Sequence, residues 1–128
     1  MDERTIEILK RFAKSWVETA NLYSDLIDNY EGFERLKPVL NFILTLKEKG
    51  EDKYFRLGTS MHILIISRSV NHGLRNDQKH LKIEAVYTND FEVIFQEGEK
   101  IYRRYRIKSL DDSKLTNSLK TLKHTLVD

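Results

Sequence analysis

Apolar residues that recur at alternating steps of three and four mark the N-terminal part of the chain. This stripe covers residues 6–30 and includes Trp16 and Tyr23, a spacing that predicts an amphipathic α-helix. Asp2 is placed to cap the helix by accepting a hydrogen bond from a first-turn amide. We interpret the stripe as a helix face packed on the core. Because it also follows a seven-residue repeat, a homodimer through this helix is the alternative.

Two further helical patterns follow. The first covers residues 33–49, and because Pro38 lacks an amide proton and restricts the residue before it, we expect the regular helix to begin near Lys37. Gly50 is placed to leave that helix in a left-handed conformation. The second lies at the C-terminal end, where leucines from Leu115 onward are spaced four, three and four residues apart. It predicts a third helix, with Ser109, Asp111 and Asp112 as candidate caps.

Between these helical patterns, short runs of β-branched and aromatic residues alternate with polar turns. They predict five strands, at residues 54–57, 62–68, 80–87, 91–96 and 101–108. Most separators are short enough for hairpins, which favours a meander, and Gly58-Thr59-Ser60 is expected to divide the first two strands. The run from Ile63 to Ile66 has no polar position, so its strand should be central and covered on both sides.

Together these elements predict an α+β fold with two N-terminal helices, a five-stranded mostly antiparallel sheet and a C-terminal helix, as a single domain over residues 1–128. Charged residues make up 33% and hydrophobic residues 40% of the chain, as in a globular protein. No run approaches the roughly twenty apolar residues of a membrane helix, so we expect no membrane association. Cysteine is absent, which excludes disulfides and thiolate sites, and we expect a cytoplasmic location.

The longest connection inside the predicted sheet, residues 69–79, is the first candidate binding site. It gathers Asn71, His72, Arg75 and Asp77 around a flexible Gly73. Long polar loops on a rigid sheet often carry binding functions. The alternative is a solvated connection whose side chains satisfy their own backbone.

The fifth predicted strand is the second candidate, because basic and aromatic residues are interleaved in it. On an extended strand Tyr102, Arg104 and Arg106 share one face. Arginine beside tyrosine suits phosphate contact and base stacking, so single-stranded nucleic acid could lie across this face. The alternative is a face whose charges pair across strands. A register that sets Arg106 opposite Glu92 would neutralise part of it.

No catalytic motif is present in the sequence. The histidines lack the spacing of a metal site, the serines lack a glycine-flanked elbow, and no glycine-rich loop would hold a phosphate, so we expect neither metal nor cofactor. We therefore expect a non-enzymatic protein-binding module with a protein partner, such as an adaptor, an antitoxin or an immunity protein. Nucleic-acid binding through the basic-aromatic strand face is the first alternative, and a small enzyme with an unrecognised site is the second.

Overall fold

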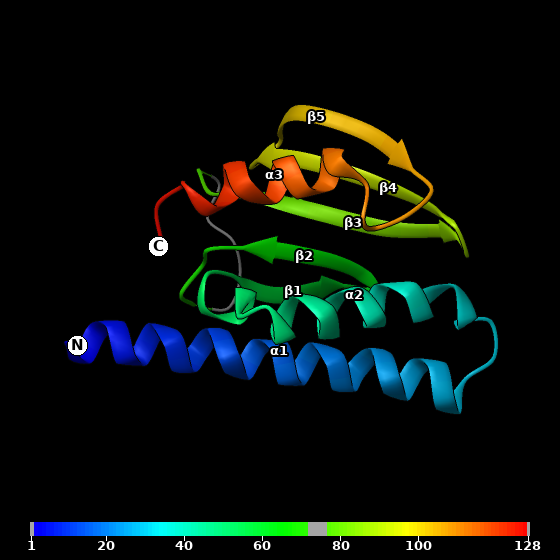
Figure 1. Ribbon diagram of the computed structural model, residues 1–128, viewed down its shortest axis with the longest axis horizontal. Coiled ribbons are helices and arrows are strands. Elements are labelled where there is room, and N and C mark those ends of the chain that lie inside the picture. The colour runs from blue at the N-terminus through cyan, green and yellow to red at the C-terminus, as the bar shows by residue number, and fades with distance from the viewer. Residues whose placement is uncertain (1, 72–76, 128) are drawn as a thin grey trace.

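The computed structural model describes residues 2–71 and 77–127. These residues form three α-helices, two short 3-10 helices and five strands (Figure 1). In chain order the elements are α1 (Glu3–Asn29), η1 (Glu34–Leu36), α2 (Lys37–Glu48), η2 (Glu51–Lys53), β1 (Arg56–Ser60), β2 (Ile63–Ser67), β3 (Lys79–Tyr87), β4 (Asp90–Glu97), β5 (Lys100–Ile107) and α3 (Ser113–Lys123). The predicted α+β fold is confirmed. None of the helices in the described ranges is both long enough and apolar enough to cross a membrane.

The strands form one antiparallel meander in the order β1-β2-β3-β4-β5. β2 lies inside the sheet between β1 and β3, as its apolar run predicts. Only one face of β2 is closed, however, because Leu64 and Ile66 are buried whereas Ile63 and Ile65 are partly exposed. The prediction of cover on both sides is therefore wrong. β-branched side chains also suit the partly solvated face of a sheet, so an all-apolar run does not require two packed faces.

The turn between β1 and β2 differs from the prediction. Gly58-Thr59-Ser60 belongs to β1, and the hairpin loop consists of Met61 and His62, because Ser60 pairs with Ile63. Met61 has a φ of 58°, in the left-handed region. Two-residue hairpin loops require positive φ to match the twist of the flanking strands, which explains why a residue other than glycine adopts this conformation here.

The helices begin and end close to the predicted positions. Asp2 caps α1 by accepting a hydrogen bond from a first-turn amide at 2.7 Å, and Asp112 caps α3 in the same way at 2.8 Å. α2 begins at Lys37, directly after η1. Gly50 follows α2 with a φ of 83°, the left-handed conformation that glycine adopts without a steric penalty.

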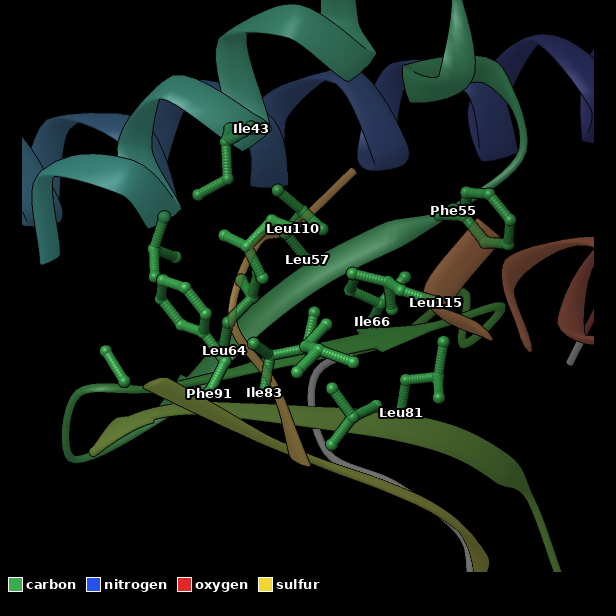
Figure 2. Packing of buried hydrophobic residues seen from close by; sticks show 14 of the residues in the cluster. Ile43, Phe55, Leu57, Leu64, Ile66, Leu81, Ile83, Phe91, Leu110 and Leu115 are labelled. Carbon is green, nitrogen blue, oxygen red and sulfur yellow. The ribbon is translucent and has the colours of Figure 1, made fainter. Parts of the chain in front are cut away.

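One hydrophobic cluster joins the three α-helices to one face of the sheet (Figure 2). It includes Trp16 and Tyr23 of α1, Ile43 of α2 and Leu115 of α3, which meet buried side chains from the strands. Trp16 and Tyr23 are only 1% and 0% exposed. The predicted stripe of α1 therefore packs on the core, and its central residues are not accessible for pairing with a second copy.

The two edges of the sheet differ in their backbone partners. At the β1 edge, two side chains of α1 form hydrogen bonds with backbone groups. Ser15 Oγ accepts a hydrogen bond from the Leu57 amide at 3.0 Å, and Trp16 Nε1 donates to the Phe55 carbonyl at 2.7 Å. Among the described residues, β5 pairs only with β4, and six of its eight residues are exposed. Unpaired backbone groups of an edge strand can pair with another chain. β5 is thus the open edge of the sheet.

Candidate functional site

The candidate site is β5, whose side chains are redistributed by a bulge. The regular pairing of β4 with β5 is interrupted after Phe95, where Tyr102 is the extra residue. Its ring packs edge-on against Phe95, with ring centroids 6.2 Å apart, on the core side of the sheet. Arg104 and Arg106 point to the opposite face. The prediction that Tyr102 shares a face with them is therefore wrong, because the bulge breaks the alternation between them.

Three cations surround the two tyrosines of β5. The ammonium groups of Lys79 and Lys100 lie 5.6 and 4.8 Å from the Tyr102 ring centroid, and the Arg103 guanidinium lies 5.4 Å from the Tyr105 ring centroid. A cation over an aromatic face at such distances is attracted by the ring. We refer to these five residues as the cation–tyrosine cluster.

A small cavity of about 200 Å³ opens between this cluster and α3. It is lined by Lys79, Phe95, Tyr102, Arg103, Ser118 and Thr121. Ligand pockets usually have about 300–1,000 Å³, so this one is small for a drug-sized molecule but large enough for one side chain of a partner. Its cations and hydroxyl groups favour an acidic side chain there.

Arg106 is held by acidic side chains. Its Nε and Nη2 donate to the two carboxylate oxygens of Asp90 at 3.1 and 2.9 Å, and it lies opposite Glu92 in the predicted register. These hydrogen bonds, together with the positive charges of Arg106 and Lys108, lower the pKa of the Asp90 carboxyl from its ordinary value. Pairing with acidic neighbours thus neutralises this end of the predicted basic face.

The other cations of the strand have no such acidic partner. In the described part of the chain, no carboxylate lies within ion-pair distance of Lys100, Arg103 or Arg104. All three side chains are exposed. This half of β5 therefore has three cations without an ion pair to the described residues, beside an open backbone edge. The acidic residue Glu97 lies opposite Lys100 and accepts a hydrogen bond from the Tyr102 hydroxyl at 2.9 Å.

Of the predicted loop residues, Asn71 lies away from β5. The Asn71 side chain accepts a hydrogen bond from Arg11 of α1, and the Asn71 carbonyl accepts one from Ser69 Oγ at 2.7 Å. Asn71 therefore lies beside α1, whereas Tyr102 and Arg104 lie on the strand at the far edge of the sheet. Asp77 is exposed just before β3, and the predicted residues His72 and Arg75 lie outside the described residues.

Two of the described histidines, His62 and His80, have structural surroundings, whereas His124 is exposed at the end of α3. The His62 ring lies 3.0 Å from Arg35 Nη2. Arg35 also donates to the Ala85 carbonyl at 3.1 Å, which links η1 to the sheet. His80 is buried, and this burial lowers the pKa of its imidazole. Within residues 2–71 and 77–127, no group of three or more possible ligands is arranged to hold a metal ion.

The sequence interpretation missed Lys79, Lys100 and Arg103. The run Tyr102-Arg103-Arg104-Tyr105 indicated a basic-aromatic cluster, but regular alternation placed Arg103 away from Tyr102, and Lys79 lies two strands away. Comparison with models of protein families, with curated proteins and with solved structures found no match to this chain. The candidate site therefore depends on the geometry alone.

Proposed function

We propose that this chain is a non-enzymatic protein-binding module that adds an extended acidic segment of a partner protein to β5. The contrast between the two sheet edges carries the proposal: α1 side chains bind backbone groups at the β1 edge, whereas β5 has β4 as its one strand partner in the described part of the chain. Strand addition supplies main-chain hydrogen bonds for affinity, and alternate side chains provide specificity. A cytoplasmic location is part of the proposal, because a chain without cysteine suits a reducing compartment.

The charge of β5 favours an acidic segment as the added strand. Lys100, Arg103 and Arg104 would face it, and each opposite-charge pair between neighbouring strands contributes about 0.2–1 kcal/mol. A second copy of β5 suits the edge less well. In an antiparallel pair centred between Arg103 and Arg104, these two arginines would lie opposite each other, and like charges directly opposite are destabilising.

Nucleic acid fits this surface less well than an acidic polypeptide. Stacking of bases requires open aromatic faces, but cations already lie over the rings of Tyr102 and Tyr105. The Tyr105 hydroxyl is also 2.8 Å from Ser118 Oγ of α3. The net charge of +2 gives little long-range attraction for a polyanion.

The proposal is tested with two fluorescein-labelled peptides of about ten residues, enough to match a long strand. One alternates glutamate with valine and the other lysine with valine. Fluorescence anisotropy should show that the acidic peptide binds and that added salt weakens binding. Arg104→Glu should weaken it about tenfold, because a favourable pair is replaced by a repulsion. Lys10→Glu changes an exposed lysine of α1 and serves as the matched control.

Amide hydrogen exchange then separates strand addition from simple charge attraction. Strand addition should slow the exchange of β5 amides that point away from β4, because they become hydrogen-bonded to the peptide. Equal affinity for both peptides, or no slowing in β5 on saturation with the acidic peptide, would refute the proposal. Tighter binding of a single-stranded oligonucleotide than of the acidic peptide would favour the nucleic-acid alternative.

A further inference from the structure

A second surface lies between α2 and α3, where a groove of about 580 Å³ opens to solvent. Both helices run from right to left in Figure 1. An ion pair between Lys123 and Glu51, at 2.9 Å, joins the C-terminal end of α3 to the turn that follows α2. The groove is lined along its length by apolar side chains that pack on or belong to the core: Phe42, Leu46, Leu110 and Leu119.

The two ends of the groove differ in charge. Lys49 at the end of α2 and Lys120 in the last turn of α3 are exposed at one end. In the described part of the chain, neither lysine has a carboxylate within ion-pair distance. Asp111, which precedes α3, lines the groove on the side where the two helices begin. Polar side chains lie among the apolar ones along the groove: Asn41, Thr45, Ser109 and Thr116. The groove therefore has apolar and polar side chains along its length, two lysines without an ion pair to the described residues at one end and Asp111 at the other.

This pattern complements a helix in one orientation. Acidic residues stabilise the first turn of a helix and basic residues its last turn. A helix antiparallel to α2 and α3 would bring its acidic first turn to Lys49 and Lys120 and its basic last turn to Asp111. Its positive N-terminal dipole end would also meet the negative C-terminal ends of α2 and α3.

We infer that the α2–α3 groove binds an amphipathic helix of a partner protein, antiparallel to α2 and α3, with its carboxylates at the lysine end. α2 has 12 residues and spans about 18 Å, so about three turns of the bound helix would fill the groove. Apolar side chains at positions i, i+3 or i+4, and i+7 would cover the floor. A small molecule fits less well, because ligand pockets usually bury most of the ligand surface and this groove is open along one side. The inference is independent of strand addition at β5.

The test uses two helical peptides of about four turns, each with a leucine stripe. One has glutamates in the first turn and lysines in the last, and the other has these charges exchanged. Anisotropy should show at least about tenfold tighter binding of the first peptide. The double variant Lys49→Glu/Lys120→Glu should reverse this preference. Lys10→Glu/Lys14→Glu, with two exposed lysines of α1, should preserve it. Circular dichroism of each variant verifies that the helices and sheet are retained.

Three outcomes would overturn the inference. The first is no binding of either peptide up to its solubility limit, and the second is equal binding of both. The third is sedimentation of the protein alone as a dimer that Lys49→Glu/Lys120→Glu dissociates, since a second copy would then cover the groove. Arg104→Glu should leave helix binding unchanged, so this test and the strand-addition test can fail separately.

Discussion

Replacement of Ser15 by alanine tests whether α1 closes the β1 edge. Ser15 is 4% exposed, and its Oγ accepts the Leu57 amide hydrogen at 3.0 Å while donating to the Phe12 carbonyl at 2.6 Å. Leu57 is itself only 3% exposed, so water has little access to the amide that the variant would leave without its acceptor. The substitution removes one hydroxyl and leaves the rest of the helix face in place.

The expected loss in the free energy of unfolding is the difference between two opposing contributions. A buried donor without its partner costs about 1–3 kcal/mol. Alanine has a higher helix propensity than serine, which returns about 0.5 kcal/mol. The net loss in the free energy of unfolding should be about 0.5–2.5 kcal/mol, and at about 4 °C per kcal/mol for a chain of this size the melting temperature should fall by about 2–10 °C.

Urea denaturation and amide exchange measure this effect. Ser24→Ala in the same helix is the matched control, because Ser24 donates only to the exposed Asp28 carboxylate at 3.3 Å and should show the propensity gain alone. The Leu57 amide should exchange faster in Ser15→Ala than in the native protein. If Ser15→Ala were as stable as Ser24→Ala and Leu57 kept its protection, α1 would not be what closes this edge.

Two pH-dependent predictions follow from the ionisable groups. Burial lowers the pKa of His80, so the unfolded chain binds a proton below about pH 6.5 that the folded chain resists, and stability falls as the pH drops. His80→Gln should lose less stability in urea titrations between about pH 7.5 and 5.5, and an equal loss in both proteins would exclude His80 as the cause. Arg106 lowers the pKa of Asp90, so its contribution is present above the unfolded value of about 3.9 and is lost as the pH falls through the folded pKa. Asp90→Asn should melt below the native protein near pH 7 but together with it near pH 2; a gap that persisted in acid would contradict this.

Features set by neighbouring residues could be predicted from the sequence. Pro38 and Gly50 place the ends of α2 correctly because their backbone restrictions act over one or two residues. The pairing of Arg106 with Glu92 was predictable from the apolar pattern instead, because setting Tyr105 opposite Val93 also sets Arg106 opposite Glu92.

Features set by contacts between distant segments could not be predicted. A regular strand and a bulged one fit residues 101–108 equally well, so the turn of Tyr102 toward Phe95 depends on packing that the pattern does not contain. Gly58 resembles a turn residue, yet β1 continues through it. Nothing lies within 4 Å of a Cβ at this position, so packing does not require a glycine there. Ser15 resembles any polar helix position, and only its partner in β1 gives it a structural role.

The meander also has a consequence for the order in which the protein assembles. Each strand pairs with the one before it, so hairpins can form after closing only short loops. α1 must instead close a much longer loop, because Trp16 and its partner Phe55 are 39 residues apart. A chain in which α1 has not yet docked would expose the backbone at both edges of the sheet, whereas the native fold leaves β5 open. Docking of the first helix would therefore reduce edge-to-edge pairing between incompletely folded chains.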